Sequence, residues 1–328
     1  MSYKIFAGGY DKEGFAELSF DGKTLTLLKK TPAVNPSYMW LSEDRQRFYT
    51  VEETREGQAV SWKLEGDVYV PDGKEPTFGS APCHVFVHED ILILANYGSG
   101  SMARCKIAED GSIKGTLPLI QHQGRSVMPM RQEGPHAHFA MLTPDGKYIA
   151  ACDLGLDQVI FYEADDMHAD LPKSHPVTVP GGCGPRHAAF LSKGEMWYVA
   201  SELSSDLLVY RGYAENAQLL QRIPLTPGVK SAPAAIRISP DEKYLFVSNR
   251  GEDTLSLFRI LPDGTVEDAG KIVVGAEQPR DAIFSPDGKY IAVACQKGSS
   301  LIIFSFEDGK AERICDYPIE GVSSALWA

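Results

Sequence analysis

The stretch QPRDAIFSPDGKYIAVACQKGSSLIIFSF, residues 278–306, reads as three β-strands joined by two turns. An apolar strand ends at Pro-Asp-Gly, a second strand rich in β-branched and aromatic residues ends at a Gly-Ser turn, and an alternating third strand follows. The same order recurs in three strong copies and two weaker ones, which start at Gly134, Gly184, Ala232, Asn35 and Ala81. No stretch carries a helical period, so the repeat predicts an all-β protein.

The spacing of the repeat predicts its architecture. The copies have leading prolines at positions 36, 82, 135, 185, 233 and 279, a period that suits a four-stranded propeller blade of roughly 40 to 50 residues. A seventh copy is split, because residues 3–20 match the second half of the unit and GVSSALWA at 321–328 supplies its inner strand. We therefore expect one seven-bladed β-propeller domain over residues 1–328, with the last blade closed by N- and C-terminal strands, which removes free sheet edges.

Composition excludes several classes of function. The net charge of -12 argues against a nucleic-acid partner. The six cysteines show no CxxC pair or zinc-ligand spacing, so we expect free thiols, no metal and no cofactor. The N-terminus has no signal-peptide pattern and no apolar run reaches about 18 residues. These patterns predict a cytoplasmic protein without a membrane partner, a monomer or weak homo-oligomer.

Equivalent positions of the blades can be compared within the one sequence. The position six residues before the turn proline holds His138, Arg186 and Arg280 in three blades, Ala234 in a fourth, and Cys83 and Ser37 in the weaker copies. This column opens the innermost strand, where packing would favour apolar residues. The charged side chains in it are candidates for a site in the propeller channel.

A second polar column ends the next strand. It reads Gly8, Glu52, Asn96, Asp153, Glu202, Asn249 and Gln296. Asn96, Asp153 and Asn249 have two interpretations, since such residues commonly cap turns but could also bind a substrate. Glu202 and Arg250 place long charged groups where a strand meets a turn, which favours a functional role. Arg237 in the strand AAIRISPD requires a paired carboxylate or a bound anion if it is buried.

Several of these segments resemble one family. GPHAHF at 134–139, GPRHAAF at 184–190, SEL at 201–203 and VSNRGEDTL at 247–255 are similar to the bacterial lactonase propellers, and the similarity spans essentially the whole chain. That family includes 6-phosphogluconolactonases of the propeller type and fungal 3-carboxy-cis,cis-muconate cyclases. The His, Arg, Glu, Arg set of the cyclases maps by this resemblance onto His138, Arg186, Glu202 and Arg250. MARCK at 102–106 and LSKGEM at 191–196 depart from the family pattern.

The resemblance implies hydrolysis of an anionic sugar lactone, 6-phospho-D-glucono-1,5-lactone, to 6-phosphogluconate in the pentose phosphate pathway. Arginine forks suit an anionic substrate and a developing oxyanion, and either His138 or Glu202 could take the proton from water. Alternatives are an intramolecular lyase of the muconate cycloisomerase type and a non-enzymatic scaffold for protein partners. No GxSxG elbow or nucleotide loop is present. The expected catalytic residues are His138, Arg186, Glu202 and Arg250, and the expected substrate-binding residues are His136, Arg237, Arg280, Asp153 and Asn96.

Overall fold

The computed structural model describes residues 2–328, and strands supply nearly all of their regular structure. Six antiparallel sheets have four strands and one has five. The helical residues form two short 3-10 turns, η1 (Ala164–Asp166) and η2 (Ala214–Asn216). Within the described part of the chain, no helix has the length and apolar character needed to cross a membrane. The predicted all-β fold with seven blades is confirmed.

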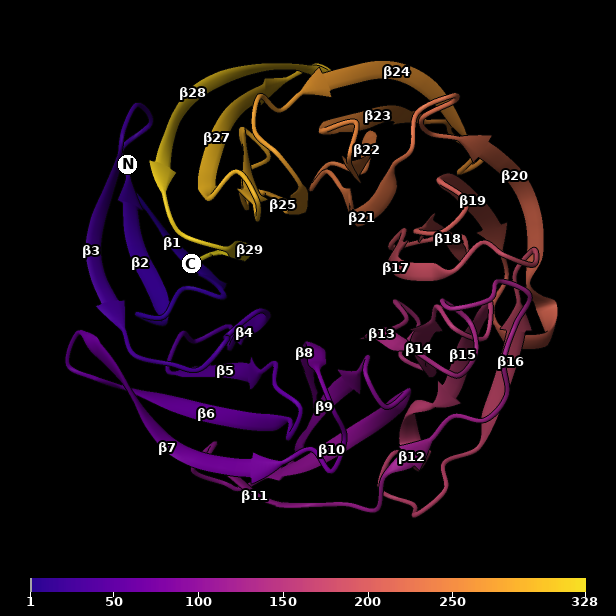
Figure 1. The fold of residues 1–328 in the computed structure, drawn as a ribbon, viewed down its shortest axis with the longest axis horizontal. Coiled ribbons are helices and arrows are strands. Elements are labelled where there is room, and N and C mark those ends of the chain that lie inside the picture. Colours follow the sequence, from indigo (N-terminus) through magenta and orange to yellow (C-terminus); the bar gives the residue numbers. More distant parts are fainter. Residues whose placement is uncertain (1) are drawn as a thin grey trace. The chain divides into compact units, whose positions relative to one another are not determined.

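The chain forms two compact units. Figure 1 shows their strands, coloured along the sequence from the N-terminus to the C-terminus. Unit 1 holds the described residues up to Asp11, Phe15–Lys30 and Pro185–Ala328, and unit 2 holds Lys12–Gly14 and Thr31–Gly184. A single domain over residues 1–328 stays a prediction.

Unit 1 contains four sheets, each with four strands in sequential order apart from the first. Their strands, sheet by sheet, are β29 (Val322–Trp327), β1 (Tyr3–Gly9), β2 (Phe15–Phe20) and β3 (Leu25–Thr31); β17 (Pro185–Phe190), β18 (Met196–Ser201), β19 (Asp206–Arg211) and β20 (Gln218–Pro224); β21 (Ala232–Ile238), β22 (Tyr244–Arg250), β23 (Thr254–Ile260) and β24 (Val266–Val273); β25 (Pro279–Phe284), β26 (Tyr290–Cys295), β27 (Ser300–Glu307) and β28 (Lys310–Pro318).

Unit 2 contains three sheets, and the middle one has an additional short strand that pairs with β10. Their strands are β4 (Met39–Leu41), β5 (Arg47–Glu52), β6 (Gln58–Glu65) and β7 (Val68–Pro76); β8 (Pro82–His88), β9 (Ile91–Asn96), β10 (Ser101–Ile107), β11 (Ile113–Thr116) and β12 (Ile120–Gln121); β13 (Ala137–Leu142), β14 (Tyr148–Asp153), β15 (Gln158–Glu163) and β16 (Ser174–Thr178).

The two ends of the chain build one sheet, as the split repeat predicts. β29 pairs with β1, from Ile5 opposite Trp327 to Gly9 opposite Val322, and Figure 1 shows the yellow C-terminal strand beside the indigo one. An edge-on contact between Tyr3 and Trp327, with ring centroids 5.5 Å apart, packs across the junction. Closure of the last blade by both terminal strands is confirmed.

The turn after the inner strand is built from the same hydrogen bonds in several blades. Ser285 Oγ donates to Asp287 Oδ1 at 2.7 Å, and Tyr290 N–H donates back to Ser285 Oγ at 3.0 Å. Thr143 and Ser239 make the equivalent bonds in their blades. Short hydroxyl and carboxylate side chains thus cap the turn locally, which explains why the Ser/Thr-Pro-Asp pattern marks the repeat.

Candidate active site

The inner strands share one irregularity, and it falls on the first polar column. In β17, Pro185 pairs with Ser201 and His187 pairs with Ala200, so Arg186 is an extra residue without an opposite partner in the ladder. Such a β-bulge re-aims a side chain and is frequent beside active sites. The same shift occurs at Cys83, His138, Arg280 and Ser323, and at Ala234 and Ala235 together. The predicted register of His138, Arg186 and Arg280 is confirmed.

The second predicted column is wrong in three blades. Asn96, Asp153 and Asn249 each pair with the residue at or just before the bulge, but the residue that does so in β18 is Ser201. Glu202, Gln296 and Gly8 therefore do not share their register, and the equivalent residues are Ser201, Cys295 and Gly9. Polarity alone placed Glu202 in this column. The register follows instead from the turns, which have the same length in both blades: Ser205 N–H donates to Ser201 O as Asp253 N–H donates to Asn249 O. Glu202 instead occupies the position that Arg250 holds in the next blade.

Glu202 and two arginines form an arginine–carboxylate cluster in unit 1. Arg250 Nη2 donates to Glu202 Oε2 at 2.6 Å, and Arg186 Nε lies 3.2 Å from the same oxygen. The side chains of Arg186 and Glu202 are 3% and 9% exposed. Arg250 Nε also donates to Ala232 O at 3.0 Å. Two guanidinium groups thus pair with one buried carboxylate oxygen, and hydrogen bonds to Glu202 and Ala232 fix the Arg250 fork.

A second, partly buried ion pair adjoins this cluster. Arg237 Nη2 donates to Asp281 Oδ1 at 3.0 Å, so the carboxylate partner expected for Arg237 is present. Asp281 follows the bulge residue Arg280, and its Oδ2 accepts from Ala325 N–H at 3.3 Å. Burial raises the pKa of Asp281, although the charges of Arg237 and Arg186 oppose the shift. Arg280 itself is half-buried.

Unit 2 holds a histidine–tyrosine cluster of Cys83, Tyr97, His136 and His138. Cys83 Sγ lies 3.5 Å from His138 Nδ1, and both residues occupy bulges. The Tyr97 ring meets the His138 ring edge-on at 5.4 Å and stacks on His136 at 4.7 Å. His136 Nδ1 lies 2.9 Å from Tyr97 O, and a carbonyl can only accept, so Nδ1 carries the proton. Both imidazoles are therefore held by a tyrosine.

Sequence reasoning missed Tyr97 as a site residue. It follows Asn96 as Glu202 follows Ser201 and Arg250 follows Asn249, so the three residues hold equivalent positions. A correctly registered second column would have revealed it.

Asp153 and Asn96 make the contacts of turn caps. Asp153 Oδ1 accepts from the N–H groups of His136 and Leu156 at 2.8 and 3.0 Å, and Oδ2 lies 2.6 Å from His122 Nδ1. Asn96 Nδ2 donates to Ser101 Oγ at 3.1 Å across its turn. These contacts match the capping alternative. A substrate-binding role for either residue stays a prediction.

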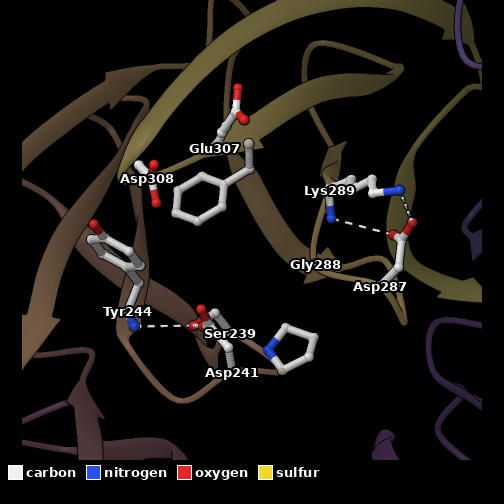
Figure 2. A pocket seen from close by; sticks show the side chains of 10 residues that line it. Ser239, Asp241, Tyr244, Asp287, Gly288, Lys289, Glu307 and Asp308 are labelled. Carbon is white, nitrogen blue, oxygen red and sulfur yellow. Dashed lines mark hydrogen bonds and ion pairs between the residues drawn. The ribbon is translucent and has the colours of Figure 1, made fainter.

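One pocket of unit 1 lies away from the arginine–carboxylate cluster, at the opposite end of strands β21 and β25. It has a volume of about 350 Å³ and is lined by Ser239, Tyr244 and Phe306 together with the carboxyl groups in Figure 2. These carboxyl groups belong to Asp241, Asp287, Glu307 and Asp308. Four acidic side chains against Lys289 make it unsuited to an anionic substrate.

Metal-ligating side chains come together at one place among residues 2–328. Glu89, Asp90 and His168 lie within reach of one ion, and all three are exposed. None of them belongs to either cluster described above.

Comparison with known proteins identifies the family. The chain matches the family model "Lactonase, 7-bladed beta-propeller" over residues 4–317, and it belongs to this family. An uncharacterized Lactococcus lactis protein, YwcC, is 32% identical over 318 residues, covering 93% of this chain and 92% of its own. A Bacillus subtilis protein named 6-phosphogluconolactonase is 28% identical and covers 92% and 90%. The structure of a Pseudomonas aeruginosa periplasmic gluconolactonase, PpgL, matches with a TM-score of 0.94 at 27% identity, over 100% of this chain and 99% of that one.

Proposed function

We propose that the protein hydrolyses an anionic sugar lactone and that its substrate is 6-phospho-D-glucono-1,5-lactone. The observation that carries the proposal is the arginine–carboxylate cluster, in which buried Arg186 and half-buried Arg250 are held by Glu202. Membership of the lactonase family and the names of the B. subtilis and P. aeruginosa relatives support a lactone as the substrate. The proposal includes a place in the pentose phosphate pathway and a cytoplasmic location.

The arginines bind negative charge at the reacting end of the substrate. Attack of water on the lactone carbonyl carbon produces a tetrahedral oxyanion, which fixed donors stabilise by roughly 3 to 4 kcal/mol each. Arg186 is aimed by its bulge and Arg250 by bonds to Glu202 and Ala232. Because these forks are held before substrate binds, little reorganisation is needed as charge develops.

Glu202 acts as a positioning residue in this proposal. Its Oε2 is engaged by two guanidinium groups, and a carboxylate so engaged is committed to orienting them. His138 is retained as the proposed general base because its motif, GPHAHF, resembles that of the lactonase propellers. It takes a proton from the attacking water, and the proton passes to the ring oxygen when the carbon–oxygen bond of the lactone breaks. We retain Arg237, Arg280 and His136 as proposed substrate-binding residues.

The test is the rate at which the purified protein opens freshly generated 6-phosphogluconolactone, at a pH below that of rapid spontaneous opening. We expect acceleration over buffer by the wild type and a loss of roughly 100-fold in Arg186→Ala. Arg186→Lys keeps the charge and loses the fork, so it should fall between them. Arg211→Ala is the matched control, because Arg211 is exposed and donates to Asp263 O. A wild-type rate equal to that of buffer overturns the proposal.

A further inference from the structure

A long connection in unit 2 is anchored at its start by a buried chain of hydrogen bonds. It comprises residues 122–136, between β12 and β13. His122 Nδ1 lies 2.6 Å from Asp153 Oδ2, and Tyr162 OH lies 2.8 Å from His122 Nε2. His122 and Asp153 have side chains only 2% and 0% exposed. A fully satisfied buried network of this kind holds its members in one arrangement.

The same connection is anchored again near its end. Gln132 is fully buried, its Oε1 accepts from Met128 N–H at 3.0 Å, and its Nε2 donates to Leu154 O at 2.9 Å. Ser126 Oγ donates to Asp157 Oδ2 at 2.6 Å. The connection is therefore a fixed support for the residue beside Gln132.

That neighbouring residue is Arg131, and it contacts the histidine–tyrosine cluster. Arg131 Nη2 donates to Tyr97 OH at 3.4 Å. The Tyr97 ring in turn contacts His138, the proposed base, and stacks on His136. His138, Tyr97 and Arg131 thus form a continuous row from the bulge of β13 to the anchored connection. The row begins at a group suited to proton transfer and ends at a cation.

We propose that Arg131 and Tyr97 form a subsite for an anionic group remote from the reacting carbonyl of the substrate, and that this group is a phosphate. The inference rests on the proposed lactone hydrolysis, with His138 at the reacting end. A guanidinium fork binds phosphate through two parallel hydrogen bonds, and the phenol adds a donor beside it. The subsite distinguishes a phosphorylated sugar lactone from its unphosphorylated counterpart.

The experiment compares two substrates, 6-phosphogluconolactone and glucono-1,5-lactone, in the wild type and three variants. We expect Arg131→Ala to raise KM for the phosphorylated lactone at least tenfold while kcat/KM for the unphosphorylated lactone stays within twofold. Tyr97→Phe keeps the ring against both histidines and should raise the same KM a few-fold. Arg125→Ala, an exposed arginine in the same connection, is the matched control and should change neither value.

A binding measurement separates this inference from the proposed function. Calorimetry with the product 6-phosphogluconate and with gluconate requires no turnover, and Arg131→Ala should weaken only the former, by about tenfold. If the wild type hydrolyses neither lactone, the proposed function fails and the calorimetric difference still decides the subsite. Equal losses on both substrates in Arg131→Ala, or unchanged 6-phosphogluconate binding, overturn the subsite.

Discussion

The two polar clusters use the same backbone positions for different chemistry. In unit 1, a bulge and the residues that end the neighbouring strands carry Arg186, Glu202 and Arg250. In unit 2, the corresponding bulges carry Cys83 and His138, and the strand-end position carries Tyr97. The repeat thus supplies a fixed way of aiming side chains, and the residues placed there decide whether the cluster is built from ion pairs or from ring contacts.

This difference has an energetic consequence. The unit 1 cluster holds two cations around one buried carboxylate oxygen, so removal of that carboxylate leaves like charges facing one another. The unit 2 cluster is built from ring contacts and a thiol contact, which tolerate small changes in one partner. Substitution of a residue that positions its neighbours should therefore cost most in the first cluster and least in the second.

Among the positioning residues, the largest expected effect is that of Glu202→Ala. It should lower kcat/KM for the lactone by roughly 100-fold and the free energy of unfolding by roughly 3 kcal/mol, because Arg186 and Arg250 lose their shared counter-charge. Enzyme assays and urea unfolding measure the two effects. Glu252→Ala, which removes a surface pair with Lys271, is the control and should cost no more than about 1 kcal/mol. A stability loss equal to that of the control would show that the arginines do not depend on Glu202.

The repeated sequence predicts the blades and the bulge residues because both follow from local patterns. Strand alternation, the Pro-Asp turns and the split terminal copy together predict seven sheets and their closure, as the pairing of β29 with β1 confirms. The predicted register of Glu202 was wrong, because the residue that pairs with Pro185 at this position is Ser201, which is less polar than Glu202. Registering turns by length would have corrected it.

Contacts between side chains of different blades could not be predicted from the repeated sequence pattern. Cys83 meets His138 across 55 positions and Arg131 meets Tyr97 across 34. Nothing in the repeat specifies which side chain of a connection reaches which neighbour, since that depends on anchors such as the buried Gln132. Charged pairs were easier to predict from the sequence, because an arginine in a blade strand such as Arg237 needs a carboxylate partner, and Asp281 supplies it.

An intermediate effect is expected from Asp281→Asn, and it depends on pH. Burial raises the pKa of Asp281 above that of the unfolded chain, so its contribution to stability is greatest below the unfolded pKa and is lost as pH rises through the folded one. The variant should therefore be least stable relative to the wild type at acidic pH, and the gap should narrow toward pH 7. Urea unfolding at several pH values measures it.

Asp263 is the control for this prediction, because its pKa is shifted in the opposite direction. The Thr265 hydroxyl, followed by its backbone N–H, lowers the pKa of Asp263, so this carboxylate adds stability above its unfolded pKa. The gap between Asp263→Asn and the wild type should widen as pH rises. If the stability difference between Asp281→Asn and the wild type also widened as pH rises, the ion pair with Arg237 would outweigh the desolvation of the Asp281 carboxylate.

The smallest expected effect lies at the thiol contact of the histidine–tyrosine cluster. Cys83→Ala removes the group 3.5 Å from His138 Nδ1 and should lower kcat a few-fold with little change in KM, because the imidazole loses one constraint on its orientation. Cys83→Ser retains a donor and should restore most of the rate. Cys105→Ala, in strand β10 of the same sheet and in contact with Thr116, should leave the rate unchanged, while His138→Ala should cost at least about 100-fold. A loss in Cys83→Ala as large as that in His138→Ala would place the thiol itself in the chemistry, and the histidine–tyrosine cluster would then be as intolerant of substitution as the arginine–carboxylate cluster.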